Sequence, residues 1–256
     1  MPETLRRRAR LDPAVLCPVD ALGLAGEREV TMSVVPLQYE DDIFYPESDG
    51  QPMGESDLHR TEMSDLIDTL QDRFRDDADV YVSGNLFFYY EKGNPKAVIC
   101  PDVFVVHGVP NRLRPIYKLW EEGRVPSMVI EVTSASTRRE DLRTKKDRYE
   151  RLGVEEYFLF DLLGDYLDPR LQGHLLTGGK YRPMPPAADG SLESRTTGLI
   201  LRPEEIQLRL VDAATGELLM RPRESRAMVR DVTAALEHLE EENARLRREI
   251  ERLKKS

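Results

Sequence analysis

Residues 127–161 carry the pattern that decides the fold: SMVIEVTSASTRREDLRTKKDRYERLGVEEYFLFD. Two short apolar runs, Ser127–Thr133 and Glu155–Asp161, flank a segment with helical spacing, Arg138–Leu152, which stops at Gly153. Short apolar runs of this kind are typical of strands that are buried on both faces. A strand–helix–strand unit within one sheet makes its two strands parallel. The stretch therefore predicts an α/β fold with a parallel pair of strands.

Elements upstream extend this unit. Residues Asp57–Arg75 have apolar side chains at helical spacing, and Ser56 or Asp57 is suited to cap the N-terminus. Two runs rich in aromatic and β-branched residues, Val80–Glu91 and Ala97–Val106, are joined by a Gly/Pro turn and predict a pair of strands. The predicted order of the core is αβββαβ.

The 256 residues, of which 40% are hydrophobic, are enough for one large domain with an appendage. Residues 1–28 lack periodicity, and we expect a loosely ordered lead-in there. The core is predicted to cover residues 29–163. Residues 164–222 are rich in Gly and Pro with short strand-like pieces, which predicts a small β-rich appendage. Residues 223–256 are predicted to form a C-terminal coiled-coil helix.

The tail has apolar residues that alternate by three and four positions. Heptad position a holds Val229, Leu236, Asn243 and Ile250. Heptad position d holds Val232, Leu239, Leu246 and Leu253. A single Asn at an a position favours a parallel dimer, because only there do two Asn side chains pair across the seam. Glu242 with Arg247, and Glu249 with Lys254, have the signs needed for pairs between helices. We predict a homodimer through this coiled coil. The alternative is an amphipathic helix packed on its own domain.

Composition excludes several classes of protein. The two cysteines have no paired spacing and the four histidines are scattered, so we expect neither a disulfide scaffold nor a zinc site. No run approaches 18 apolar residues, which predicts no membrane span. The first 19 residues lack the apolar region of a secretory signal, so we expect a cytoplasmic location.

The net charge of −10 first argues against a nucleic-acid partner. Residues 27–79, however, contain 16 acidic and four basic side chains, and they account for the excess. The segment from Arg138 to Arg151 is locally basic. The bulk charge therefore does not exclude DNA. It predicts a weak non-specific affinity for DNA, which falls quickly with added salt.

Two acids interrupt apolar strands. Asp102 lies within AVICPDVFVV, and Glu131 lies within SMVIEVT. An ionised carboxylate in a buried run costs several kcal/mol unless it is paired or binds a cation. The alternative is that each side chain points to the solvated face of its strand.

A lysine on the following helix is also unusual. Lys145 falls in the middle of the apolar stripe at 100° per residue, and a lysine that points at the sheet would meet Glu131. The alternative is an ordinary helical ion pair with Asp141, four residues earlier. Two carboxylates and a lysine that converge suit Mg²⁺ or Mn²⁺, which prefer oxygen ligands. Such a cation polarises a phosphodiester, and the ammonium group stabilises the developing negative charge.

These residues also carry a family resemblance. Pro101-Asp102, then Ser127 to Ser134, then Asp141-x3-Lys145-x3-Tyr149-x3-Gly153 resemble a large bacterial family of restriction-endonuclease-like proteins. That family, formerly a domain of unknown function, is a branch of the PD-(D/E)XK nuclease superfamily. The resemblance runs from about Tyr39 to Asp161, and more weakly to Val211. It implies a restriction-endonuclease-like core, in agreement with the predicted αβββαβ order.

The resemblance assigns roles residue by residue. Asp102 matches the Asp of the first half-motif and Glu131 the acid of the second, and both would bind the metal. The superfamily's lysine usually follows two residues after that acid, where this chain has Thr133. The family is thought to supply the lysine from the next helix, and Lys145 is the match. Further acids and a histidine are accessory candidates: Glu55, His59, Glu62 and Asp141.

We therefore expect a dimeric endonuclease that hydrolyses phosphodiester bonds, most simply in duplex DNA, with Mg²⁺ or Mn²⁺. One alternative is a catalytically inactive protein that keeps the nuclease fold as a DNA-binding or dimeric interaction module. Another is a structural oligomerisation module whose interior acids are only paired. The last alternative fits the tail but does not explain Asp102, Glu131 and Lys145 together.

Overall fold

The computed structural model describes residues 43–47, 56–134 and 140–255. The predicted lead-in over residues 1–28 and the accessory candidate Glu55 lie outside the described residues. Among the described helices, none is long and apolar enough to cross a lipid bilayer.

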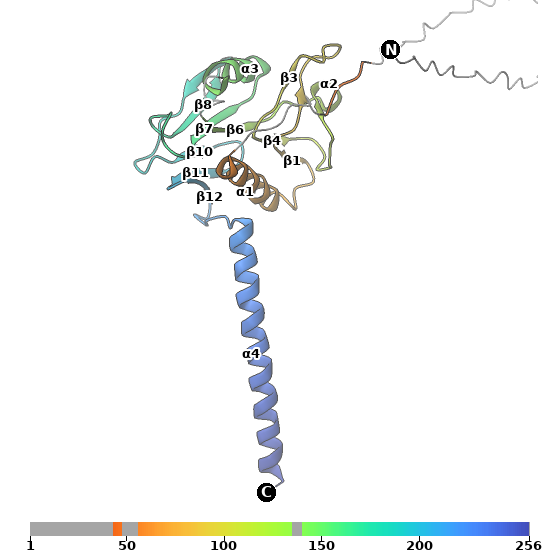
Figure 1. Cartoon of the computed structure of the whole chain (residues 1–256), viewed down its shortest axis with the longest axis vertical. Helices are drawn as coiled ribbons and strands as arrows, with labels where there is room; N and C mark the ends of the chain where they lie inside the picture. Colours follow the sequence, from red (N-terminus) through yellow and green to blue (C-terminus); the bar gives the residue numbers. More distant parts are fainter. Residues whose placement is uncertain (1–42, 48–55, 135–139, 256) are drawn as a thin grey trace, which may run out of the picture. The chain divides into compact units, whose positions relative to one another are not determined.

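A six-stranded sheet in the order β1-β4-β6-β7-β8-β9 is the frame of the fold (Figure 1). Its strands are β1 (Val80–Ser83), β4 (Val103–His107), β6 (Met128–Thr133), β7 (Glu156–Asp161), β8 (Leu171–Thr177) and β9 (Lys180–Pro183). β6 and β7 are parallel, with Met128 opposite Glu156 and Thr133 opposite Asp161. The other neighbouring strands are antiparallel. The predicted parallel pair and the mixed α/β fold are confirmed.

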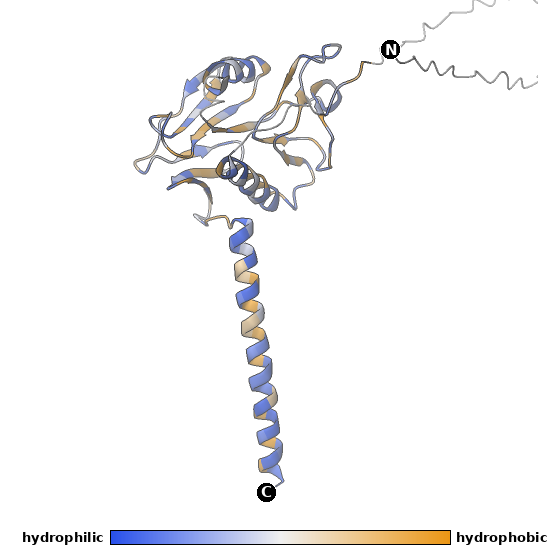
Figure 2. Ribbon diagram, viewed as in Figure 1, coloured by the Kyte–Doolittle hydropathy of each residue, from blue (hydrophilic) through white to orange (hydrophobic). Residues whose placement is uncertain are grey.

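The central strands β4, β6 and β7 are buried on both faces, which explains their continuous apolar runs. Along β6, Met128, Ile130 and Val132 join one hydrophobic core, and Val129 joins the other. Figure 2 shows the central strands coloured mainly as apolar. Because successive side chains alternate between faces, Glu131 points to the same side as Val129.

Helix α1 (Asp57–Arg73) covers the face to which Met128 and Ile130 point. Ser56, one of the two predicted candidates, is its N-cap, and the Ser56 side chain accepts a hydrogen bond from the backbone N–H of His59 at 3.2 Å. The helix ends at Arg73, two residues before the predicted end, because Phe74 leaves the helical conformation as the C-cap. The buried positions of α1 follow the predicted apolar stripe and also include His59 and Glu62.

The two predicted strands of residues 80–106 are each broken in two. The first forms β1 and β2 (Phe88–Tyr89), and the second forms β3 (Val98–Ile99) and β4. β2 and β3 join β5 (Tyr117–Lys118) in a separate three-stranded sheet. The break occurs where Gly84 approaches the backbone of Asp102 so closely that a Cβ atom would overlap the Asp102 carbonyl oxygen. Sequence periodicity does not reveal such a close approach.

The helix predicted over residues 138–152 is not a regular α-helix. Its described part begins as a π-helix, η1 (Glu140–Lys145), and continues as α3 (Lys146–Leu152). Gly153 ends α3 in the left-handed conformation, with φ of 87°, as its position predicted. A π-helical turn at the start of an α-helix changes the direction of its side chains, and such turns are frequent at functional sites.

Residues 164–222 contribute more to the core than the predicted appendage would. β8 and β9 extend the central sheet, and β10 (Leu192–Ser194), β11 (Leu199–Glu204) and β12 (Gln207–Asp212) form a second antiparallel sheet. Leucines of this second sheet, such as Leu201 and Leu208, share one hydrophobic core with α1 and β6. The Gly/Pro-rich composition reflects tight turns within the core domain, although the boundary at residue 163 remains a prediction.

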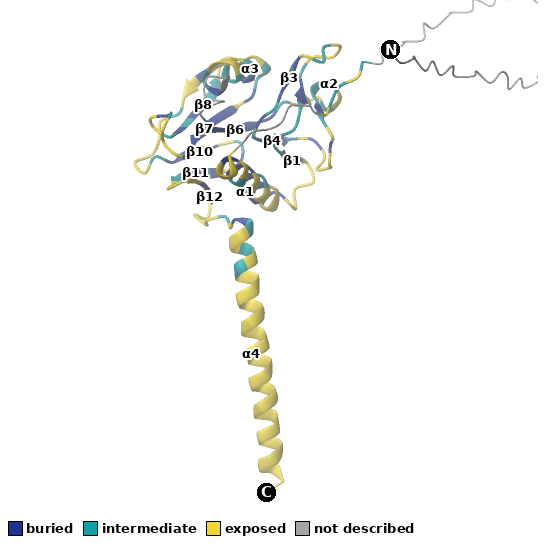
Figure 3. Ribbon diagram, viewed as in Figure 1, coloured by how far each residue is buried: buried dark blue, intermediate teal, exposed yellow. Residues whose placement is uncertain are grey.

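The described part of the chain has two further helices. The short helix α2 (Leu119–Glu122) follows β5, and the long helix α4 (Pro222–Lys254) follows the second sheet. α4 has no buried residue, and Figure 3 colours nearly all of it as exposed. Its apolar heptad residues, among them Leu236 and Ile250, are about half exposed. This exposure contradicts the alternative in which the tail packs against its own domain.

Replacement of Gly84 by alanine tests the close approach to Asp102. The new Cβ would force the strand end away from the Asp102 carbonyl group, so we expect a loss of roughly 1–3 kcal/mol in the free energy of unfolding. Urea unfolding followed by circular dichroism measures it. Ser83→Ala, at the neighbouring residue, is the control and should change stability little. Equal stability of the two variants would contradict the described packing.

Candidate active site

Asp102, Glu131 and Lys145 come together although they lie on three different elements. Lys145, the last residue of η1, places its Nζ 2.8 Å from Oε2 of Glu131 in the middle of β6. Asp102, just before β4, donates its backbone N–H to the same Oε2 at 3.3 Å. The Asp102 carboxylate in turn accepts the backbone N–H of Val132 at 2.7 Å. The structure therefore joins the three residues that the sequence predicted.

The site is deeply placed but not closed. The side chain of Glu131 is 0% exposed, whereas Lys145 and Asp102 are 12% and 16% exposed. The alternative in which the two acids point to a solvated face is therefore wrong for Glu131. Asp102 and Lys145 form the edge of the site that water and a substrate would reach.

Lys145 also contacts Asp141, which the sequence offered as an alternative partner. The Lys145 Nζ lies 3.2 Å from Oδ1 of Asp141, and Asp141 is fully buried. The predicted ion pairs of Lys145 with Glu131 and with Asp141 are both present. The two therefore do not exclude each other. A single ammonium group bridges a carboxylate on its own helix and a carboxylate on the sheet.

Tyr149 completes the surroundings of Glu131 and was given no role from the sequence. Its hydroxyl group donates to Oε1 of Glu131 at 2.7 Å, and the ring is buried. The position four residues after Lys145 was the available signal, since residues i and i+4 share one helix face. Both carboxylate oxygens of Glu131 thus have donors.

Of the accessory candidates, His59 reaches the site and Glu62 does not. The Nε2 atom of His59 lies 2.6 Å from the carbonyl oxygen of Val132 and 3.4 Å from Oδ2 of Asp102. Because a carbonyl oxygen only accepts, Nε2 carries the proton. Glu62 instead bonds Arg221 and the backbone of Leu208, away from Asp102. His59 is therefore a buried, hydrogen-bonded histidine that lies beside Asp102.

The three central groups change one another's pKa. Burial raises the pKa of Asp102, but the His59 hydrogen bond and the charge of Lys145 outweigh it and leave that pKa below its usual value. Burial, with the nearby Asp102 and Asp141 charges, raises the pKa of Glu131 despite Lys145. Burial lowers the pKa of Lys145, but the surrounding carboxylates, with Glu131 first, raise it above the usual range. The net shift therefore favours the protonated form of Lys145.

The donor atoms of Asp102 and Glu131 fit a hard divalent cation. Both are carboxylates, and each charge opposes ionisation of the other, which a cation between them would relieve. Within the described part of the chain, no cluster of three or more His, Cys, Asp or Glu side chains has the arrangement of a metal site. Two carboxylates are nevertheless sufficient for Mg²⁺, which usually keeps several waters and binds substrate phosphates.

Comparison with known families places the chain in one of them. Residues 37–204 match the model of the Uma2 family, which is described as "Putative restriction endonuclease". The chain belongs to the Uma2 family. The match includes Asp102, Glu131 and Lys145, and it extends beyond the predicted core into the second sheet.

Among solved structures, this Uma2 chain is similar to a protein from Anabaena variabilis, described as a "putative nuclease belonging to DUF820". The two share 12% sequence identity, and the alignment covers 57% of this chain and 76% of the other, with a TM-score of 0.42. Among curated proteins, none matches the chain.

Removal of the Lys145 charge should destabilise this Uma2 protein. In Lys145→Ala the buried Glu131 loses its cation, and breaking a buried ion pair costs about 3–5 kcal/mol. Urea unfolding at neutral pH measures the loss. Lys180→Ala removes an exposed partner of Glu150 and is the matched control, for which we expect little change. A Lys145→Ala protein as stable as the control would show that the pair does not stabilise the fold.

Proposed function

We propose that the protein is a divalent-metal-dependent endonuclease that hydrolyses phosphodiester bonds in DNA. The observation that carries the proposal is the convergence of Asp102, Glu131 and Lys145 from three separate elements, with 2.8 Å between Lys145 and Glu131. Membership of a family described as "Putative restriction endonuclease" supports the same activity. With DNA as substrate, we propose a cytoplasmic location.

Asp102 and Glu131 are the proposed ligands of Mg²⁺ or Mn²⁺. A bound divalent ion would polarise the phosphodiester and make water a stronger nucleophile. Asp102 is suited to this role because its lowered pKa keeps it ionised and part of its side chain is exposed. Tyr149 and Lys145 hold the Glu131 carboxylate in one orientation. Ligands fixed in this way need little rearrangement when the ion binds.

Lys145 is the proposed source of positive charge for the reaction. Because the carboxylates around it raise its pKa, it stays protonated near neutral pH and cannot act as a base. An ammonium group at the partly exposed edge of the site can stabilise negative charge that develops on the phosphate, or can orient a water molecule. Thr133, which occupies the usual lysine position of the superfamily, has a buried side chain.

The second candidate is an inactive protein that keeps the nuclease fold for DNA binding or dimeric interaction. The observation in its favour is that the oxygens of Glu131 already accept bonds from Tyr149, Lys145 and the Asp102 N–H. A metal ion would have to displace or share these contacts. An activity assay separates the two candidates directly.

We also propose that the protein acts as a homodimer through a parallel coiled coil of α4. The exposed apolar stripe and the charge pairs predicted between helices support a second copy as the partner. The proposed contact residues of the stripe are Leu236, Leu239, Asn243, Leu246, Ile250 and Leu253. Two nuclease domains held together could cut both strands of a duplex.

Cleavage of supercoiled plasmid tests the nuclease. We expect nicked and linear products with Mg²⁺ or Mn²⁺ and none with EDTA. Loss of one group that stabilises the transition state costs about 10²–10³-fold in rate. We therefore expect Asp102→Asn, Glu131→Gln and Lys145→Met each to lose at least that much, measured as the initial rate of product formation on gels.

The matched control is Asp165→Asn, which changes an exposed acid. Equal cleavage by the wild type and the three site variants would refute the assigned residues. A folded wild type that binds duplex DNA but never cleaves it with either metal would instead support the inactive candidate.

Replacement of Asn243 tests the coiled coil. Asn243→Ile puts an apolar residue at an a position that the proposed dimer would bury, so we expect a more stable assembly with a mixture of oligomeric states. Analytical ultracentrifugation and thermal unfolding measure the two effects. A wild type that sediments as a monomer at micromolar concentration would rule out the dimer.

A further inference from the structure

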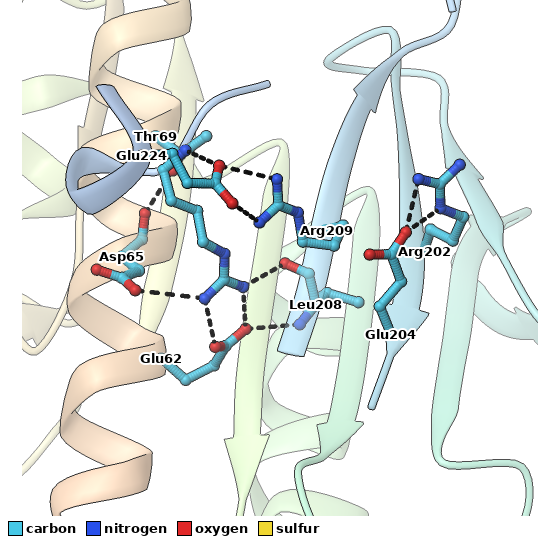
Figure 4. Close-up of polar contacts among 9 residues, drawn as sticks. Glu62, Asp65, Thr69, Arg202, Glu204, Leu208, Arg209 and Glu224 are labelled. Carbon is cyan, nitrogen blue, oxygen red and sulfur yellow. Dashed lines mark hydrogen bonds and ion pairs between the residues drawn. The ribbon is translucent and has the colours of Figure 1, made fainter. Parts of the chain in front are cut away.

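The first turn of α4 is fixed to the domain by a buried arginine. Arg221 is the N-cap residue of α4, and its side chain is only 7% exposed. Its two terminal nitrogens donate to both oxygens of Glu62 on α1 at 2.8 Å, and Glu62 is 3% exposed (Figure 4). This planar two-point contact allows one relative orientation of the two groups.

Further bonds tie the same turn to β12. The Arg221 guanidinium donates to the carbonyl oxygen of Leu208 at 2.9 Å, and the Leu208 N–H donates to Glu62 at 2.7 Å. Glu224, in the first turn of α4, accepts two bonds from Arg209 of β12 and one from the Arg221 N–H. We call Glu62, Arg221, Leu208, Arg209 and Glu224 the α4 anchor.

The anchor joins α4 to the candidate active site through one helix. Glu62 and His59 are three residues apart on α1, so they lie on neighbouring positions of one helix face. Glu62 holds Arg221, and His59 contacts the Val132 carbonyl oxygen next to Asp102. α1 is therefore bonded to the start of α4 and to the site within about one helical turn.

An exposed helix such as α4 could be attached to the domain without burying the side chains of the anchor. A buried ion pair adds little net stability over apolar residues of the same size, but it restricts geometry. α4 also begins with Pro222 at its first helical position, which limits the backbone at the point of attachment. These features favour a role in which the direction of α4 relative to the domain matters.

We propose that Arg221 and Glu62 are positioning residues, which hold the two active sites of an α4-paired dimer in a single relative orientation for cutting both strands of a duplex. The partner on the α4 stripe is a second copy of this chain, because Glu242 and Glu249 face Arg247 and Lys254 of an identical helix in parallel register. The inference rests on the proposed nuclease activity and the proposed dimer. It adds that the anchor sets the orientation of the two nuclease domains relative to each other.

The test removes the Glu62–Arg221 pair and leaves the Arg209–Glu224 bonds in place. Asp65, which Arg221 also contacts at 3.3 Å, has a 15% exposed side chain and loses this partner. In the double variant Glu62→Gln with Arg221→Met, the Gln side chain still offers an oxygen to the Leu208 N–H, and Met fills the space of the arginine stem. The matched control makes the same two changes at the exposed pair Glu204→Gln with Arg202→Met, which is not bonded to α4 (Figure 4).

A second variant inserts six Gly and Ser residues after Ala227. It leaves every anchor residue in place but makes the connection to the stripe flexible. This variant decides the question if the anchor variant does not fold.

Distance measurement between protomers is the first readout. A spin label on Glu193→Cys, in a Cys17→Ser and Cys100→Ser background, reports the separation of the two domains by pulsed electron spin resonance. We expect a narrow distribution for the wild type and the control, and a broad one for the anchor and insertion variants, with all four dimeric by sedimentation. Equally narrow distributions, or a monomeric wild type, would overturn the inference.

Plasmid cleavage is the second readout. We expect the wild type and the control to convert supercoiled DNA largely to linear product, and the two altered dimers to release several-fold more nicked circles at a similar rate of first cleavage. An unchanged nicked fraction would overturn the positioning role. A wild type with narrow distances and no cleavage would refute the nuclease but leave the orienting role of the anchor intact.

Discussion

The buried carboxylate of Glu131 is the constraint on which the site depends. It lies in the middle of a strand that is covered on both sides, where a carboxylate without partners would be very costly. The surrounding elements supply those partners: Lys145 from the π-turn, Tyr149 from α3, and the Asp102 backbone from the start of β4. The close approach of Gly84 to Asp102 holds the last of these in place. The same contacts that satisfy Glu131 thereby create a charged site beside the interior strands β4 and β6.

Helix α1 has two functions in this arrangement. It covers one face of the sheet with apolar residues such as Leu66 and Leu70, and it carries two buried polar groups that point to different parts of the protein. His59 contacts the backbone beside the proposed metal ligands, and Glu62 holds the start of α4. Buried polar groups are retained when they specify geometry, and here they connect the site with the proposed dimer helix.

The nuclease and the inactive candidate share this geometry and differ in how Glu131 responds to a cation. In a nuclease, the contacts from Lys145 and Tyr149 orient the carboxylate and still leave it able to bind metal. In an inactive protein, the same contacts satisfy it permanently. The proposed catalytic lysine, Lys145, lies on the helix, and the position two residues after Glu131 holds Thr133. This placement is compatible with activity, because the Lys145 Nζ still reaches the Glu131 carboxylate.

The sequence by itself determined the parallel strand pair, the helix end at Gly153, a helix start at Ser56 or Asp57, and the heptad pattern of the tail. It also indicated Asp102, Glu131 and Lys145 as candidate site residues. Each of these depends on local periodicity or on residues out of place in a local pattern. Only the tertiary structure decided the break of the strands at Gly84, the role of Tyr149, the place of β8 and β9 in the main sheet, and the pairing of Glu62 with Arg221, 159 residues away. These features depend on contacts between distant segments, and neither periodicity nor propensity specifies which distant groups will meet.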